Sequence, residues 1–377
     1  MTLLSVKNNT VIICTNERII SYNIIDNTST EITIPPLECP SHLTKNQQDV
    51  LKNEKTTVLA TSFSKYGDLF AICTLNKQLV VYNSEYKVLK NLNVARTVSK
   101  IRFTPSNNII IADKTGDVYF FDLKSENCEA EQILGHLSML LDALVTDCEK
   151  FIITCDRDEK IRVSHFPGAY NIVSYCLGHD EFVLNLELLN EKVLISSSGD
   201  GTVRFWNYLE GKQLKIINTN DHIKDTKLLE KFSEFMDTET VDVTSLPITS
   251  MKVITFESDS IIVVSLYNFN GVQIYQLNSE IDVHVLQILS FDSKLLSFDL
   301  TNDKLYILTE DSLQEYVFDG KLYKLTLSPK LTEFYTNCKD MVNNAIKENI
   351  SVLYKRKYDN VQDYQERKKL RIENQKK

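Results

Sequence analysis

The fold is decided by the stretch GHDEFVLNLELLNEKVLISSSGDGTVRFW, residues 178–206. Apolar residues alternate from Phe182 to Leu188, a second apolar run covers 193–197, and a third alternating run ends at Trp206. Turns rich in Asn, Asp and Gly separate the three runs. Alternation with a period of two, interrupted by such turns, predicts short antiparallel strands. A unit of about forty residues with a Gly-His start and a Trp near its end is typical of one blade of a β-propeller.

The third strand of this unit has counterparts along most of the chain. Its last residue aligns with five other aromatic residues and one Ser, which gives the strand ends Tyr22, Tyr82, Phe121, Ser164, Trp206, Tyr275 and Tyr316. Seven units of four strands predict an all-β, seven-bladed WD40-type β-propeller over residues 1–328, with six or eight blades as alternatives. Either residues 2–6 or residues 322–327 alone would complete the last blade.

Two long intervals between these strands predict insertions at 35–56 and 218–247. The second has helical spacing from Asp225 to Met236, which indicates a helix that either covers its own blade or docks a partner. After Pro329, apolar residues from Leu331 to Ile346 predict a further helix capped by Thr332. Asn360 is placed to begin a final, basic helix. Residues 329–377 are therefore expected to form a C-terminal helical extension with a basic tail.

Composition and charge distribution narrow the class of protein. The chain is 43% hydrophobic and 25% charged, enough to bury a core. The sequence has no apolar run of the ~20 residues that span a membrane, and its N-terminus does not resemble a signal peptide. The eight Cys include no CxxC pair, which favours small buried residues in a reducing compartment. The net charge is −9, but residues 355–377 carry +5, so an acidic body bears a basic tail.

The polar set His179, Ser196, Asp200 and Trp206 has the spacing of a hydrogen-bonded tetrad found in WD-repeat blades. It could be mistaken for a Ser-His-Asp hydrolase site, but the strand–elbow–helix context is missing. We predict that it is structural. Gly135-His136 opens the preceding blade in a similar way, with Ser164 in place of the Trp, so the tetrad there is partial at best. The sequence contains no metal-binding His pair, P-loop or GxGxxG motif, so we predict neither a catalytic nor a metal site.

The turn from Asp156 to Arg162 is unusually charged, with six charged residues out of seven. One blade earlier, Lys114 lies in the equivalent turn, and adjacent blades place equivalent turns side by side. Lys114, Asp158, Glu159 and Arg162 are thus predicted to form one mixed-charge patch. Such a patch suits a protein partner with complementary charges. The alternative is a turn that is simply solvated.

Several of these motifs carry a family resemblance. The segments ADKTGDVY (112–119), LGHLSMLLD (134–142), ITCDRDEKIRVSHFP (153–167), LGHDEFV (177–183) and SSGDGTVRFW (197–206) resemble the non-catalytic WD-repeat subunit of the eukaryotic tRNA (guanine-N7)-methyltransferase. The tail YKRKYDNVQDYQERKK (354–369) is similar to the end of that family's chains. The resemblance covers about a third of the chain, in blades three to five and the tail.

The resemblance implies a scaffold that does no chemistry. It would bind a separate catalytic subunit through the side of the propeller, and that subunit would carry S-adenosylmethionine and methylate N7 of guanosine 46 in tRNA. The implied partner-binding residues are Lys114, Asp156, Arg157, Asp158, Glu159, Lys160 and Arg162, with Arg162 foremost. The chain itself is expected to hold no cofactor. The implied location is the nucleus, with the cytoplasm as an alternative.

The basic tail is expected to lie near the tRNA, either along its phosphates or packed on the catalytic subunit. The predicted tRNA-proximal residues are Lys355, Arg356, Lys357, Arg367, Lys368, Lys369 and Arg371. A nuclear-import or solubilising tail is the alternative. For the whole chain, the competing hypothesis is a generic WD40 interaction scaffold in another nuclear complex, which would bind at the top face around the central channel.

Overall fold

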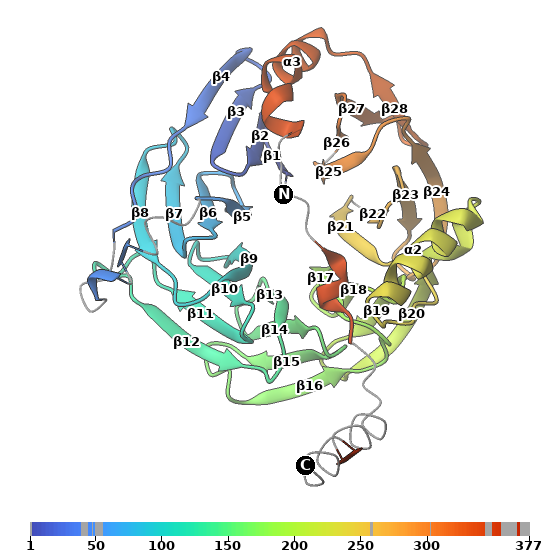
Figure 1. The fold of residues 1–377 in the computed structure, drawn as a ribbon, viewed down its shortest axis with the longest axis horizontal. Helices are drawn as coiled ribbons and strands as arrows, with labels where there is room; N and C mark the ends of the chain where they lie inside the picture. Colours follow the sequence, from blue (N-terminus) through green and yellow to red (C-terminus); the bar gives the residue numbers. More distant parts are fainter. Residues whose placement is uncertain are drawn as a thin grey trace.

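A computed structural model describes residues 2–38, 44–46, 48–49, 56–256, 259–301, 303–343, 349–355 and 368–369. In this part of the chain, seven four-stranded antiparallel sheets form a ring (Figure 1). Blade 1 consists of β1 (Thr2–Lys7), β2 (Thr10–Thr15), β3 (Arg18–Asn23) and β4 (Thr28–Ile32), and blade 2 of β5 (Val58–Phe63), β6 (Leu69–Thr74), β7 (Gln78–Asn83) and β8 (Val88–Asn93). Blade 3 consists of β9 (Val98–Phe103), β10 (Ile109–Asp113), β11 (Asp117–Phe121) and β12 (Ala130–Gly135), and blade 4 of β13 (Leu140–Val145), β14 (Phe151–Asp156), β15 (Ile161–His165) and β16 (Ile172–Cys176).

Blade 5 consists of β17 (Val183–Leu188), β18 (Val193–Ser198), β19 (Thr202–Asn207) and β20 (Lys212–Asn218). Blade 6 consists of β21 (Ile248–Thr255), β22 (Ser260–Leu266), β23 (Gly271–Leu277) and β24 (Val283–Ser290). Blade 7 consists of β25 (Leu295–Leu300), β26 (Lys304–Thr309), β27 (Leu313–Phe318) and β28 (Tyr323–Thr326). Each predicted strand end, from Tyr22 to Tyr316, lies in the third strand of its blade. The prediction of seven blades is therefore confirmed. The prediction was reliable because strand alternation and turn residues are local signals.

The ring closes without exchanging a strand between the first and last blades. β1 pairs with β2 inside blade 1, and β28 pairs with β27 inside blade 7, so 322–327 completes the last blade alone. Two side chains of β25 instead accept backbone N–H groups of β1. Asp299 accepts from Val6 at 2.6 Å, and the Ser297 hydroxyl accepts from Leu4 at 3.2 Å. These bonds join the first and last blades of the ring.

The helix after the propeller, α3 (Pro329–Asn343), lies across this closure (Figure 1). Phe334, Cys338 and Val342 are buried in one cluster with apolar residues of blades 1 and 7. The helix starts earlier than predicted, because Pro329 suits the first helical turn and the Ser328 hydroxyl accepts the Leu331 N–H at 3.4 Å. Thr332 is therefore not the cap; its hydroxyl donates to the Ser328 carbonyl. Ala345, Ile346 and the predicted cap Asn360 lie outside the described residues.

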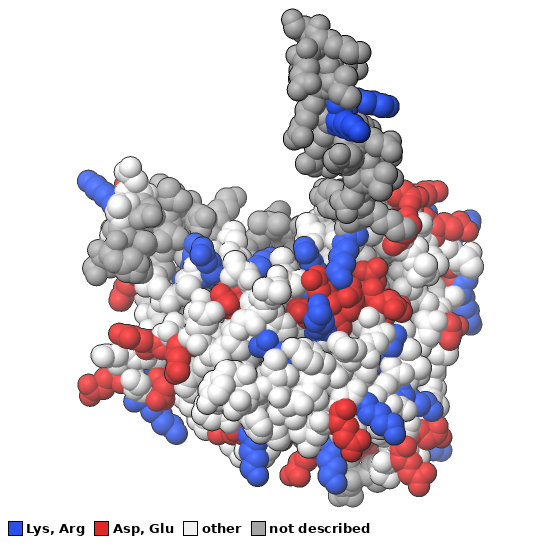
Figure 2. All heavy atoms as spheres, turned by 90° about the horizontal axis from the view of Figure 1, so that it is seen from below, with Lys and Arg blue, Asp and Glu red and all other residues white. Residues whose placement is uncertain are grey.

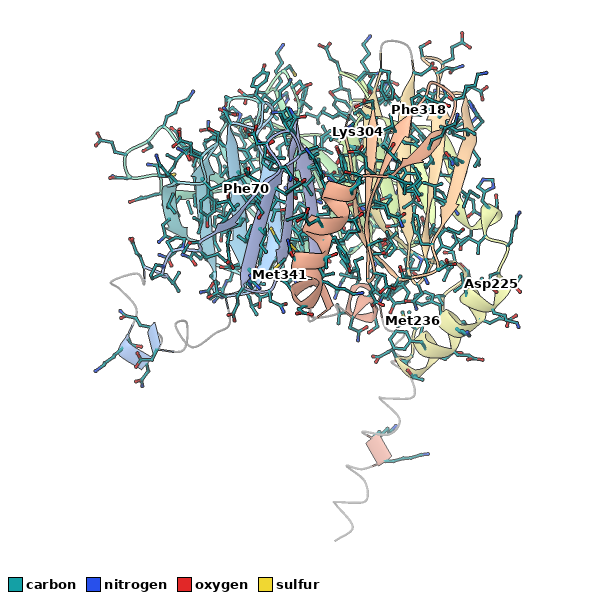
Figure 3. The ribbon with its side chains drawn as sticks, turned by 90° about the horizontal axis from the view of Figure 1, so that it is seen from above. Phe70, Asp225, Met236, Lys304, Phe318 and Met341 are labelled. Carbon is teal, nitrogen blue, oxygen red and sulfur yellow. The ribbon has the colours of Figure 1, made fainter. Side chains whose placement is uncertain are left out.

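The insertion before blade 6 holds the short 3-10 helix η1 (Thr219–His222) and the predicted helix, α2 (Thr226–Thr238), with Asp225 as its N-cap. Phe232 and Met236 of α2 are buried in an apolar cluster with residues of blades 4, 5 and 6. Figure 3 places Met236 and Met341, the latter near the end of α3, on the same face of the propeller. A second 3-10 helix, η2 (Ile350–Leu353), joins the same buried cluster as α2. The described chain contains no helix long and apolar enough to cross a membrane.

The innermost strands carry ion pairs between blades. The Arg102 guanidinium donates two hydrogen bonds to Asp142, at 2.9 and 2.6 Å, and a third to the Leu186 carbonyl. Asp142 also accepts the Leu186 N–H at 3.0 Å. Strands β9, β13 and β17 are thereby tied together around the axis of the ring. Arg102 also pairs with Glu187, so removing one partner would leave a buried charge without compensation.

Candidate functional site

The charged turn of blade 4 is held from inside by Asp156, which is 2% exposed. One of its carboxylate oxygens accepts the N–H groups of Asp158 and Lys160, at 2.9 and 3.0 Å. The other lies 2.8 Å from His136 Nδ1, and His136 Nε2 lies 2.9 Å from the Thr154 hydroxyl. Asp156 is thus too buried to reach a partner, and it fixes the backbone on which the exposed residues stand.

The equivalent turn of blade 3 is built in the same way. Asp113 is buried and accepts the N–H groups of Thr115, Gly116 and Asp117 at 2.8 to 3.0 Å. Gly116 has φ of +106°, and a Cβ there would lie 2.6 Å from the His136 carbonyl oxygen. A residue with a side chain would therefore both strain the turn and push the neighbouring connector away. Lys114 stands exposed on this turn.

The connector 136–139 joins the two turns. The His136 N–H donates to the Gly116 carbonyl at 2.7 Å, and the Arg157 N–H donates to the Met139 carbonyl at 2.9 Å. Leu137, between these two bonds, is fully exposed. The backbone contacts place Lys114, Leu137 and the blade-4 turn on one continuous surface at the seam of blades 3 and 4.

Arg162 lies in β15 at the edge of this seam. Its neighbours Ile161 and Val163 point the other way, into the buried core shared with blade 5. The Arg162 guanidinium donates to the Gly135 carbonyl at 3.0 Å. Its buried Nε has no hydrogen-bond partner among the described residues. A donor that is buried and unpaired is costly to the folded state.

A group of exposed apolar side chains extends the surface onto the outer strand of blade 4. Tyr175 pairs with Arg162 across β15 and β16 and so shares its face. It is 40% exposed, and three more large apolar residues beside it are also exposed, namely Tyr170, Ile172 and Leu177. Reasoning from the sequence missed these residues. The available signal was the segment IVSYCL (172–177), which has one polar residue, Ser174, where the outermost strand of a blade is expected to have more.

We define the blade 3–4 surface as Lys114, Leu137, Lys160, Arg162 and Tyr175. Figure 2 views the molecule from the lower edge of Figure 1, where β12 and β16 lie. Basic and acidic side chains gather there near one rim, and much of the remaining surface is uncharged. Cationic groups next to exposed aromatic and aliphatic groups are typical of a protein interface.

Asp158 and Glu159 belong to the same turn but have a different contact. The Lys355 ammonium pairs with the Glu159 carboxylate and lies 3.8 Å from an Asp158 oxygen. Glu181 lies close by, and burial together with the Glu159 charge raises the pKa of its carboxyl to about 7. The predicted patch is therefore divided. Its cations lie on the blade 3–4 surface, while two of its carboxylates bind a residue of this chain's own tail.

The blade-5 polar set is a closed network. His179 Nδ1 lies 2.8 Å from Asp200, and its Nε2 lies 2.8 Å from the Ser196 hydroxyl. The Trp206 indole N–H also donates to Ser196, at 2.8 Å. Ser196 has no exposed surface, and burial lowers the pKa of His179. A substrate could not reach this Ser, so the contacts serve to satisfy buried polar groups.

Blade 4 has the incomplete version of this network. His136, Asp156 and Thr154 reproduce three positions, but Ser164 stands where the Trp would be. The Ser164 hydroxyl is buried and has no hydrogen-bond partner within the described part of the chain. That part of the chain also contains no group of three or more His, Cys, Asp or Glu that could hold a metal ion.

Of the predicted tail residues, Lys368 and Lys369 are exposed and Lys355 is paired with the blade-4 turn. Arg356, Lys357, Arg367 and Arg371 lie outside the described residues. The helical basic tail as a whole therefore stays a prediction.

Together these features define a WD-repeat β-propeller whose catalytic-looking residues are structural. A family model described as "tRNA methyltransferase TRM82 WD40 domain" matches residues 122–318. The chain belongs to this family. The match begins at the end of blade 3 and ends with β27, so it includes the blade-4 turn.

Relatives in insects extend the similarity over most of the chain. Proteins named tRNA (guanine-N(7)-)-methyltransferase non-catalytic subunit wuho are 30% identical in Culex quinquefasciatus and 33% identical in Drosophila melanogaster. The alignments cover 87% and 85% of this chain, and 78% and 76% of the two relatives.

Solved structures show the same fold at low identity. A chain of the structure titled "Crystal Structure of Mitotic Checkpoint Complex" superposes with a TM-score of 0.63 at 13% identity, over 84% of this chain and 89% of that one. A computationally designed protein, Ika8, superposes with a TM-score of 0.55 at 14% identity, over 84% of this chain and 82% of its own. These similarities concern the propeller architecture alone.

Proposed function

We propose that this protein is the non-catalytic subunit of a heterodimeric tRNA (guanine(46)-N7)-methyltransferase. It binds the catalytic subunit through the blade 3–4 surface and supports formation of 7-methylguanosine in tRNA. Family membership supports the class of complex. The observation that carries the binding site is the set Lys114, Leu137 and Arg162, which lies on or beside two turns whose backbone the buried Asp113 and Asp156 hold in place.

The chemistry of this surface indicates what it binds. The positive charges of Lys114, Lys160 and Arg162 call for carboxylates or carbonyl oxygens on the partner. The exposed side chains of Leu137 and Tyr175 call for an apolar group on the partner that packs between the charged contacts. Since the hairpin turns are already ordered, association costs little conformational entropy there. A folded protein face with acidic groups around an apolar centre fits these requirements.

In this proposal the two subunits have different roles. S-adenosylmethionine and the methyl transfer belong to the catalytic partner, and this chain contributes a stable docking surface. The body of the propeller is acidic, whereas residues 355–377 carry +5. Transfer RNA is therefore contacted mainly through the complex, with the basic tail as this chain's contribution. A nuclear location, with the cytoplasm as alternative, is part of the same proposal.

The competing function is a generic WD40 scaffold that binds its partner on the face around the central channel. The two hypotheses predict different sensitive residues. Leu137 and Leu327 provide a matched pair, since both are highly exposed leucines, one on the blade 3–4 surface and one beyond blade 7. Neither side chain is part of the core, so an effect on binding reports the interface and not the fold.

The test is co-purification and affinity measurement with the catalytic subunit. We expect Leu137→Asp and Arg162→Glu to weaken binding at least tenfold, which corresponds to about 1.4 kcal/mol. Leu327→Asp should bind like the wild type. The purified chain alone should not methylate tRNA, and adding the catalytic subunit should restore the activity. Wild-type binding by both blade 3–4 variants, or methylation by this chain alone, would contradict the proposal.

A further inference from the structure

Residues 349–355, which follow α3 in the sequence, pack on the propeller against residues that are far away in the sequence. Asn349 caps the short helix η2 by accepting the Ser351 N–H at 3.0 Å. Ile350 and Tyr354 are buried in the apolar cluster of blades 4 and 5. In Figure 1 this segment, coloured orange-red, lies by β17 and β18, well away from α3. The chain thus leaves the ring closure at α3 and is fastened again at blades 4 and 5.

Tyr354 is the apolar part of the attachment. Its ring meets Phe182 edge to face with centroids 5.0 Å apart, and it lies 6.2 Å from Phe232 of α2. Its hydroxyl donates to the Gly199 carbonyl at 3.3 Å. The side chain is 3% exposed. A ring in contact on several sides, with its hydroxyl satisfied, is held in one position.

Lys355 is the polar part of the attachment. Its ammonium pairs with Glu159 and lies near Asp158, both in the blade-4 turn. Glu181 of blade 5 also faces this group: burial and the charge of Glu159 raise the pKa of its carboxyl, whereas the charge of Lys355 lowers it. Lys355 thus pairs with two carboxylates of the blade-4 turn and also acts electrostatically on Glu181. Without that Lys they would repel one another.

Helix α2 also contacts this C-terminal segment. It presents Phe232 toward Tyr354 on one side and toward Tyr267 on the other, with centroids 5.1 Å apart in the second pair. Its apolar side is thereby covered in part by its own blades and in part by the chain's C-terminal segment. The helix of the 218–247 insertion therefore has a specific occupant within the same chain, and that occupant is residues 349–355.

We propose that α2 and the rim of blades 4 and 5 form a docking socket for residues 349–355, and that this socket fixes where the basic tail leaves the propeller. The exit point is next to the Asp158–Glu159 turn, which continues directly into Lys160 and Arg162 of the blade 3–4 surface. The socket thus delivers the tail beside the docked catalytic subunit. This last consequence rests on the proposed function, whereas the socket itself does not.

The socket is tested on the full chain alone. A zero-length carbodiimide reagent joins an amine to a carboxylate in direct contact, so we expect a Lys355–Glu159 cross-link by mass spectrometry. In Tyr354→Ala the cross-link should fall at least fivefold, and the amides flanking position 354 should exchange hydrogen at least tenfold faster. The control is Lys339→Glu, which breaks the exposed pair that Lys339 of α3 forms with Asp311, and it should change neither readout. Absence of the cross-link in the wild type, or its persistence in Tyr354→Ala, would overturn the socket.

The delivery role is tested on the assembled complex. We expect Tyr354→Ala to leave affinity for the catalytic subunit unchanged and to lower tRNA affinity at least threefold. Unchanged tRNA affinity would overturn the delivery role while leaving the proposed function intact. Loss of partner affinity would overturn it as well, because residues 349–355 would then belong to the protein interface. Failure of the proposed function itself would show in Leu137→Asp, which does not touch the socket.

Discussion

Replacing Phe334 by Ala tests whether α3 locks the propeller ring. Phe334 is 3% exposed and stacks on Tyr22 of blade 1, with ring centroids 4.6 Å apart and planes 14° apart. The same cluster includes Tyr306 and Leu308 of blade 7. The helix therefore bridges the first and last blades of the ring. Removing the ring should loosen the closure and not only the helix.

The expected size follows from the burial. Truncating a buried Phe to Ala typically costs 3–5 kcal/mol, including the cavity that is left behind. Since α3 is at the surface and can partly collapse into the space, we expect about 3 kcal/mol. With a urea m value of about 3 kcal/mol per M, the unfolding midpoint should fall by about 1 M.

The single Trp of the sequence makes the assay specific. Trp206 is in β19 of blade 5, buried and remote from the closure, so its fluorescence reports unfolding of that blade. If α3 locks the whole ring, the Trp206 transition in urea should shift with the transition seen by circular dichroism. If α3 only stabilises its own surroundings, the Trp206 transition should stay in place.

A matched control separates ring closure from the loss of any helical Phe. Phe235 lies in α2 and is 38% exposed, so Phe235→Ala should cost well under 1 kcal/mol. An unshifted Trp206 midpoint in Phe334→Ala, or equal shifts in the two variants, would refute the locking role of α3.

Three further predictions concern other parts of the chain. The pKa of Glu181 is raised to about 7, so folding favours the protonated carboxyl, and the contribution of Glu181 to the free energy of unfolding is lost as the pH rises through 7. The urea midpoint of the wild type should therefore decline between pH 5 and 8, and Glu181→Gln should flatten this decline. Parallel pH profiles of the variant and the wild type would count against this prediction. Trp206→Phe removes the N–H that Ser196 accepts, which should lower stability by about 2 kcal/mol or more in thermal unfolding followed by circular dichroism, whereas an unchanged melting temperature would show that the network contributes nothing. Truncation after Lys355 should leave the heterodimer intact but make its tRNA affinity less sensitive to salt. The slope of log affinity against log salt concentration should fall in magnitude by roughly 0.7–0.9 for each phosphate that the tail neutralises. An unchanged slope would exclude the tail from the RNA interface.

Local patterns in the sequence predicted the ring, its turns and the blade-5 network. Alternation of apolar residues and the Asn, Asp and Gly of each turn depend only on neighbours along the chain, so the third strands could be placed from Tyr22 to Tyr316. The spacing of His179, Ser196 and Trp206 was informative for the same reason, since one blade brings them together. The start of α3 was misplaced by a few residues because Pro329 and Ser328 together favoured the earlier turn.

The contacts that distinguish this propeller depend on its closed geometry. The pairing of Lys355 with Glu159 joins residues that are 196 positions apart, and no local pattern specifies it. It also divides a turn that, along the chain, is one charged run. The exposed Leu137 and Tyr175 became recognisable only when burial could be assigned to each face of a strand.

By itself, then, the sequence determined the seven blades, the helix before blade 6 and the charged turn of blade 4, because each depends on residues that are close in the chain. The tertiary structure decided how the ring closes, which carboxylates are already paired, and where the C-terminal segment is fastened. Those outcomes depend on contacts between segments that are far apart in the sequence, such as the first and last blades. Contacts between segments this far apart are fixed only by the packing of the whole ring.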